Sequence, residues 1–156
     1  MRRSSFLTRA ALLLLASLTL AARPSGLDLE FLARVGSIMQ AQIELSQLTR
    51  HKGASREVLR LGQEQQRTQR DALDRLQAVG VNQDFWMEPG LQDPEVQLYK
   101  ELDNLDGERF DEAYLRQRDA TRAELTRVLS DEARWGRDPA LRAYAADELR
   151  RMQAAP

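Results

Sequence analysis

With 156 residues, a net charge of −1 and no cysteine, the chain is expected to form one domain around a single apolar core. Its 23 basic residues are balanced by 24 acidic residues, which argues against a concentrated positive surface and against nucleic acid as a partner. The lack of cysteine rules out disulfides, a thiol nucleophile and a zinc ribbon.

The first 22 residues have the pattern of a secretory signal peptide. Arg2, Arg3 and Arg9 precede the apolar run ALLLLASLTLAA, which ends in small residues. Because this run is short for a membrane span, we expect cleavage after Ala21 or Ala22, with an uncleaved anchor as the alternative. Cleavage leaves 20 of the 23 basic residues against 24 acidic ones, so the net charge falls to about −4. We therefore expect a periplasmic or secreted protein without a membrane span.

The remaining residues, 23–156, are predicted to form one helical domain. Phe31, Val35 and Ile38, spaced by four and three residues, mark the apolar stripe of a first helix. Glycines and Asp-Pro pairs mark where later helices end and begin, and no segment has the alternating, β-branched pattern of a strand. The predicted helices cover residues 27–52, 56–79, 94–105, 108–135 and 139–152. We predict an all-α, antiparallel four-helix bundle, with the short helix 94–105 as an extra element between the two helix pairs.

One long connection, VNQDFWMEPGLQD, joins the second and third predicted helices. It carries Phe85, Trp86 and Met87 in a row. These side chains either cover an open end of the bundle or form an exposed patch that docks a partner. Cover is favoured, because exposed Phe-Trp pairs are costly unless a partner uses them.

Two helical segments lose their large apolar residues where a bundle needs them. GQEQQRTQRD, residues 62–71, is one, and RQRDATRAE, residues 116–124, is the other. In the first helix, Gln42 interrupts the apolar stripe at a core-spaced position. Antiparallel packing can bring these segments to one height. We predict a central polar layer formed by Gln42, Gln65, Gln69, Arg118 and Arg122, with Glu64 and Asp71 as further members.

Three interpretations of this layer stay open. It is a hydrogen-bonded or salt-bridged layer that fixes helix register, or the helices splay there and the residues are solvated. In the third interpretation Arg118 and Arg122, which share one helix face, hold a carboxylate or phosphate that Gln69 orients. Pairing of the two arginines with Glu64 or Asp71 is the structural alternative to such an anion pocket, and it is the favoured one.

Three segments resemble the bacterial domain of unknown function family 4142. They are FLARVGSIMQAQIELSQLTRHKGASREVLRLGQ, LDGERFDEAYLRQ and DPALRAYAADEL, of which LDGERFDEAY is the most specific. The resemblance implies an exported, ferritin-like helical protein without a defined activity. It also implies Asp-His pairs in the second and the long helix, a Glu in the first helix and a His near the C-terminus. In this sequence the Asp-His position of the second helix is occupied by Thr68 and Gln69, and that of the long helix by Thr121 and Arg122. The position of the Glu is occupied by Gln42, with Glu44 nearby, and the C-terminal His falls near Ala155.

The family's histidines are therefore missing from this chain. Ferritin-like di-metal sites take a Glu from two helices and a Glu-x-x-His from two others. The sequence has a single histidine, His51, at the expected end of the first helix, and no Glu-x-x-His. Glu44 and Glu64 are the remaining candidates for a carboxylate-only metal site, which neighbouring arginines would oppose. We expect no cofactor and no metal.

No catalytic arrangement is visible in the sequence. A P-loop and a glycine-rich dinucleotide turn are absent, and one histidine near a helix end argues against a Ser-His-Asp triad. In the adjacent pairs Asp111-Glu112 and Asp131-Glu132 the carboxylates point to different helix faces, and we interpret them as solvated charges.

We therefore expect a non-catalytic binding or structural protein of the cell envelope. Its partner is an unidentified protein or small molecule, and its oligomeric state is left open. The alternatives are a divergent metal-binding bundle and an oligomerising or docking module that uses the loop around Trp86.

Overall fold

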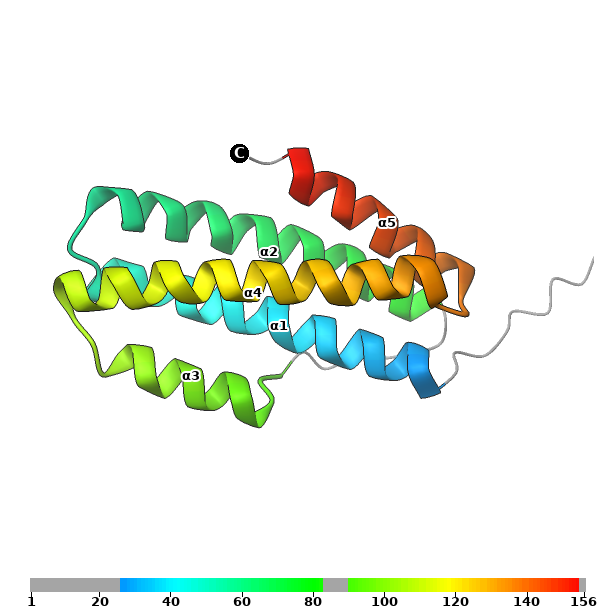
Figure 1. Cartoon of the computed structure of the whole chain (residues 1–156), viewed down its shortest axis with the longest axis horizontal. Helices are drawn as coiled ribbons and strands as arrows, with labels where there is room; N and C mark the ends of the chain where they lie inside the picture. The colour runs from blue at the N-terminus through cyan, green and yellow to red at the C-terminus, as the bar shows by residue number, and fades with distance from the viewer. Residues whose placement is uncertain (1–25, 83–89, 155–156) are drawn as a thin grey trace, which may run out of the picture.

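The structure is a computed structural model that describes residues 26–82 and 90–154, and it is helical throughout these ranges (Figure 1). No strand occurs in them, so the all-α prediction is confirmed. The predicted helix bounds agree with the observed ones within three residues. The helices are α1 (Gly26–Lys52), α2 (Arg56–Asn82), α3 (Asp93–Asp103), α4 (Gly107–Trp135) and α5 (Pro139–Ala154).

The largest deviation is at the end of α2. Gly80 was predicted to end this helix, but α2 continues to Asn82 with Gly80 buried inside it. A glycine within a helix costs only about 1 kcal/mol relative to alanine, so it does not end a helix by itself. Gly107 is different, because it starts α4 with a φ of 62°, which favours glycine.

Helix α1 lies at the centre of the packing. It contacts α2, α3 and α4, while α5 packs on α4 and α2. The colours of Figure 1 show each helix running along the long axis opposite to the one before it. Helix α3 is held by Arg34 of α1, which pairs with Glu95 at 2.5 Å and with Glu124 of α4. The described helices are therefore connected mainly through α1.

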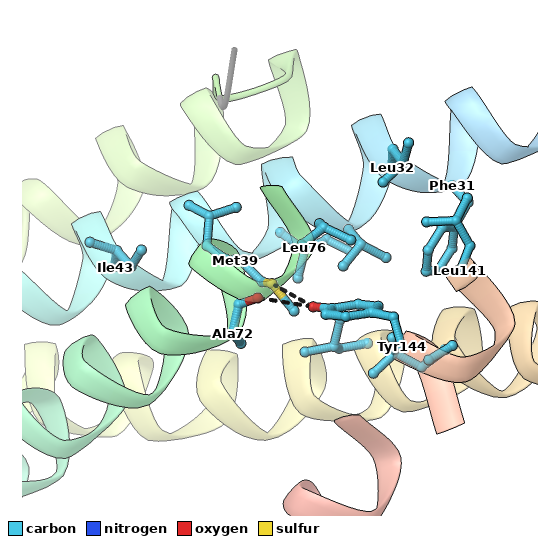
Figure 2. Close-up of a cluster of buried hydrophobic side chains, with 14 residues drawn as sticks. Phe31, Leu32, Met39, Ile43, Ala72, Leu76, Leu141 and Tyr144 are labelled. Carbon is cyan, nitrogen blue, oxygen red and sulfur yellow. Dashed lines mark hydrogen bonds between the residues drawn. The ribbon is translucent and has the colours of Figure 1, made fainter. Parts of the chain in front are cut away.

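The apolar core is divided into two clusters. One joins α1, α2, α4 and α5 around fully buried side chains such as Leu32, Leu76 and Leu129 (Figure 2). The other lies among α1, α2, α3 and α4 around Val58 and Phe110. Helices α2 and α4 pass from one cluster to the other through the two segments that lack large apolar residues. The polar segments thus separate two apolar clusters.

Tyr144 attaches α5 to the first cluster. Its hydroxyl donates to the carbonyl oxygen of Ala72 in α2 at 3.1 Å and lies 3.8 Å from the sulfur of Met39 in α1 (Figure 2). Burial raises the pKa of this hydroxyl well above its ordinary value, so it stays a donor at neutral pH. This contact fixes the middle of α5 over α1 and α2.

Helix α5 is shorter than the helices it covers. It has 16 residues, whereas α2 has 27 and α4 has 29. At a rise of 1.5 Å per residue these lengths are about 24, 40 and 43 Å. Helix α5 packs on α4 and α2, and Figure 1 shows it beside only one part of their length. The uncovered part begins where α2 and α4 become polar.

The segment LDGERFDEAY has a structural role. Phe110 is fully buried and stacks on Tyr114, whose hydroxyl lies 3.3 Å from that of Ser46. The carboxylate of Asp111 accepts hydrogen bonds from the backbone amides of Ala54 and Ser55 at 3.1 and 2.9 Å. The interpretation of Asp111 as a solvated charge is therefore wrong, because its side chain points at the turn between α1 and α2. Its neighbour Glu112 is exposed, as expected.

Candidate functional site

A polar pocket lies where α5 stops covering α2 and α4. We call it the α2–α4 pocket; its volume is about 510 Å³. Its lining comes from α2, α4 and the last turns of α5, with Gln42 contributed by α1. Clefts of this size commonly hold small organic molecules. The lining residues are Gln42, Leu61, Glu64, Gln65, Arg67, Thr68, Gln69, Asp71, Arg75, Arg118, Arg122, Leu125, Glu148, Arg151 and Met152.

Three glutamines form the inner part of the pocket. Gln42 and Gln69 are 5% and 7% exposed, and Gln65 is half-buried. The Nε2 of Gln65 donates to the Oε1 of Gln42 at 2.8 Å, which joins α2 to α1. The Oε1 of Gln69 is buried and has no hydrogen-bond partner among the described residues. A buried amide oxygen without a partner is costly and rare, which marks this position for explanation.

The pocket carries more positive than negative side chains. Five arginines line it against three carboxylates, an excess of two positive charges. Arg75 and Glu148 cancel each other in a pair with a closest approach of 2.8 Å, in which the Glu148 side chain is buried. That pair fixes α5 to α2 and leaves four arginines against two carboxylates.

Arg118 and Arg122 project from one face of α4. Arg122 donates to the carbonyl oxygen of Met152 near the end of α5. The Nη1 of Arg118 lies 3.8 Å from the exposed Asp119. Within the described ranges neither arginine pairs with Glu64 or Asp71. The pairing that was favoured over an anion pocket is thus not formed.

The structure brings the five predicted layer residues together, since all of them line this pocket. They do not form a closed layer inside the bundle, because they differ in how far they are exposed to solvent. Gln42 and Gln69 are buried, Gln65 and Arg118 are intermediate, and Arg122 is exposed. The polar segments therefore lie along an opening between α2 and α4.

The metal-ligand candidates are separate from each other. Glu44 accepts a hydrogen bond from Gln40 at 2.9 Å, whereas Glu64 lines the pocket and pairs with Arg60 at 3.4 Å. In the described part of the chain no group of three or more His, Cys, Asp or Glu side chains is placed to hold a metal ion. The single histidine, His51, is exposed in the last turn of α1.

Besides Arg118 and Arg122, the pocket has three basic residues that were not predicted from the sequence. Arg67, Arg75 and Arg151 line it together with Glu148. A signal was available in α2, where Glu64, Thr68, Asp71 and Arg75 repeat at intervals of four, three and four residues and so share one face. That face looked solvated because the position of α5 along α2 and α4 was not predictable.

A second group of buried charges lies at the start of α5. Glu132 is 8% exposed, and its Oε1 has no hydrogen-bond partner among the described residues. Burial, and then the negative charges of Asp28 and Asp138, raise the pKa of Glu132 to about 7, while Arg142 lowers it. Interpreting Glu132 as a solvated charge was wrong, because its side chain lies under the turn that connects α4 to α5. Asp131 beside it is exposed.

Two sets of predicted residues lie outside the described ranges. One is the docking candidate formed by Phe85, Trp86 and Met87, and the other is the predicted signal peptide, residues 1–22. Across residues 26–82 and 90–154, none of the helices is both long and apolar enough to cross a membrane.

Comparison with known proteins identifies the family. Its sequence profile, described as Domain of unknown function (DUF4142), matches residues 15–155, and the chain belongs to this family. Neither a curated protein nor a solved structure matches the chain. The expected family membership is thus confirmed.

Proposed function

We propose that this member of the Domain of unknown function (DUF4142) family is a non-catalytic binding protein of the cell envelope, with the α2–α4 pocket as its binding site. The observation that carries the proposal is Gln69. Its side chain is buried at the pocket, and its amide oxygen has no partner among the described residues. Because this oxygen is closed off from solvent, the Gln69 side chain has to turn toward the pocket for a bound polar molecule to supply the missing hydrogen bond and recover its free energy.

The arrangement of the helices supports a binding site at this position. In the proposed fold, α1, α2, α4 and α5 form an antiparallel, ferritin-like four-helix bundle, and α3 is an extra helix packed on α1 and α4. Binding sites of helical bundles lie between facing helices. Here the pocket occupies the place that a longer fourth helix would fill. The positions at which the resemblance implies Asp-His pairs are thus proposed to have become part of an opening lined by arginine and glutamine.

The proposed location rests on the N-terminal sequence. Three arginines, an apolar run and small residues near Ala22 are the parts of a secretory signal. Intact mass measurement on protein from a periplasmic extract tests this proposal. Loss of the first 21 or 22 residues supports export with cleavage, and a full-length chain found only in the cytoplasm contradicts it.

The binding role is tested by filling the pocket. Thr68 lines the pocket with an exposed side chain, so Thr68→Trp would occupy part of its volume without changing its charge. Gln63→Trp is the matched control, because Gln63 is exposed on the same helix and does not line the pocket. Each protein is equilibrated with the small molecules of a periplasmic extract, and native mass spectra are recorded.

A stoichiometric adduct on the unchanged protein and on Gln63→Trp, but not on Thr68→Trp, is the expected result. An adduct that persists on Thr68→Trp would place the binding elsewhere. The absence of any adduct on all three proteins would contradict the binding role and favour a purely structural one. The adduct mass also separates an organic ligand from a metal ion.

A further inference from the structure

We infer that the ligand of the α2–α4 pocket is a small, hydroxyl-bearing organic anion with at least two carboxylate or phosphate charges; this inference rests on the proposed binding function. It assigns a chemical class of ligand from the distribution of charge, amide groups and volume around the pocket. Each of these three properties restricts the chemical class of the ligand independently.

Charge sets the sign of the ligand. After the Arg75–Glu148 pair is set aside, Arg67, Arg118, Arg122 and Arg151 face the pocket against Glu64 and Asp71. Glu64 already has a partner in Arg60, at 3.4 Å. Like charges gathered around one pocket repel one another, and an anion bound among them relieves that repulsion. Asp119, 3.8 Å from Arg118, lies outside the pocket lining, so the lining itself keeps an excess of two positive charges, which matches a ligand with two negative charges.

The two long walls of the pocket are not equivalent. The α4 wall supplies Arg118 and Arg122, and the last turns of α5 add Arg151, without an unpaired carboxylate. The α2 wall is mixed, since Glu64 and Asp71 accompany Arg67. Guanidinium groups bind carboxylate and phosphate through pairs of hydrogen bonds. The anionic groups therefore face α4 and α5, and hydroxyl donors face the carboxylates of α2.

Arg122 remains able to bind although it already donates to Met152. A guanidinium has five N–H donors, and one of them reaches the carbonyl oxygen of Met152. The same contact fixes the side chain beside Arg118, one helical turn away on α4, so little conformational freedom is lost on binding. The α5 end thus positions an anion-binding residue as well as closing the pocket.

Gln69 explains the requirement for a hydroxyl. Its buried Oε1 accepts no hydrogen bond from the described residues, so once the side chain turns into the pocket this oxygen fits a donor such as an alcohol. If the amide is turned over, the NH₂ group faces the same point and donates to a carboxylate oxygen. A molecule with both groups satisfies Gln69 in either orientation, which a fully deprotonated inorganic anion such as sulfate does not.

Volume and polarity limit the size of the ligand. A pocket of about 510 Å³ is larger than one phosphate or sulfate ion needs. Leu61, Leu125 and Met152 are the only apolar residues among those lining it, so it lacks the apolar wall that a lipid or an aromatic ligand requires. A small polar organic molecule is the class that remains.

The test is calorimetric titration of the mature protein at low ionic strength. Citrate is the hydroxylated carboxylate probe, glycerol 3-phosphate is the hydroxylated phosphate probe, and sulfate, which has no hydroxyl, tests for simple anion binding. Glycerol and glutamine are the neutral and zwitterionic controls. We expect one site for citrate or glycerol 3-phosphate, with an affinity at least about tenfold above that for either control. The stronger of the two organic anions identifies the source of the charge.

Two double variants separate pocket charge from net charge. Arg118→Gln with Arg122→Gln removes two charges of the pocket. Arg127→Gln with Arg134→Gln removes two exposed charges of the same helix outside it. The pocket variant is expected to lose at least about tenfold in affinity and the control less than about threefold. Raising the salt from 0.02 to 0.3 M is expected to weaken binding as well.

The outcomes distinguish this inference from the function on which it rests. Binding of glycerol or glutamine with equal strength, insensitive to the arginine variants, would overturn the anionic class and leave the binding role intact. Binding of sulfate as tightly as the organic anions would overturn the requirement for a hydroxyl-bearing molecule. If none of the probes binds while the extract gives a pocket-dependent adduct, the inferred class is wrong and the function holds. If the extract also gives no adduct, both are wrong.

Discussion

Glu132 provides the sharpest prediction about stability, because its buried carboxyl faces two other acids. Asp28 lies on α1 and is 2% exposed. Asp138 is held by the backbone amides of Ala140 and Leu141, at 2.8 and 2.9 Å from its Oδ1. Arg142 is the positive group in this neighbourhood. Together burial and the two acids raise the pKa of Glu132 from 4.5 to about 7.

Because the pKa of Glu132 is raised in the folded chain, the sign of the pH dependence of stability is fixed. Between about pH 4.5 and 7 the folded chain keeps the proton of Glu132, and the unfolded chain loses it. This group's contribution to stability is therefore present in acid and is lost as the pH rises through 7. At about 1.4 kcal/mol per pKa unit, the loss amounts to about 3 kcal/mol by pH 8.

Glu132→Gln removes this dependence, because glutamine has nearly the same shape and does not ionise. The variant is expected to match the unchanged protein near pH 4.5 and to exceed its free energy of unfolding by about 3 kcal/mol at pH 8. Urea unfolding at several pH values measures the difference. Glu112→Gln, at an exposed position of α4, is the control and should show no such trend. A Glu132→Gln difference that stays constant with pH would refute the reasoning.

Three further variants test packing and polar contacts. Gly62→Ala should lower the free energy of unfolding by about 1–3 kcal/mol, because its Cβ would lie 2.2 Å from the Oγ1 of Thr49. Urea unfolding measures the loss, and adding Thr49→Ala should restore part of it, since the Cβ of residue 49 would still lie 2.9 Å away. Asp111→Ala should lower the free energy of unfolding by about 2–3 kcal/mol, because it removes the acceptor of two backbone amides in the turn between α1 and α2. An unchanged melting temperature would contradict this structural role of Asp111. Gln69→Leu should raise stability by about 1–2 kcal/mol in urea unfolding while abolishing ligand binding in calorimetry; a variant that binds normally would remove Gln69 from the site.

The helices could be predicted because their signals are local. Apolar residues spaced by three and four, glycines and Asp-Pro pairs fix where each helix runs, and tertiary packing moved those bounds by three residues or fewer. The exception is Gly80, which is buried within α2 next to Val79, a residue that packs against the first apolar cluster. Local signals did not fix how far α5 reaches along α2 and α4, since that depends on where its inward residues meet the rest of the core.

The pocket was predictable in composition but not in form. The missing apolar residues at 62–71 and 116–124 indicated a shared polar region, and their side chains do line one pocket. Whether that region is a closed layer or an open pocket depends on the lateral coverage by α5. The hydrogen-bond partners of the pocket arginines also depend on the position of α5, because Arg122 donates to the carbonyl oxygen of Met152 in that helix.

For the buried acids Asp111 and Glu132, the sequence predicts the side of the helix but not the partners. Adjacent carboxylates do point to different faces, and Glu112 and Asp131 are exposed. Their neighbours Asp111 and Glu132 share the face of the apolar anchors, Glu132 being three residues after Leu129, so the helical phase carried a signal that they turn inward. The groups they meet come from residues more than 50 positions away in the case of Asp111. No local pattern identifies such partners.

The central claim is that the α2–α4 pocket binds a small organic anion, and the side-chain amide signals of the glutamines test it most directly. In a ¹⁵N-labelled mature protein titrated with citrate and then with glycerol 3-phosphate, the amide signal of Gln69 should shift and saturate, together with that of Gln65. The signal of Gln63, exposed on the same helix and outside the pocket, should stay in place. A Gln69 signal that stays unmoved at saturating concentrations of both anions would contradict the claim.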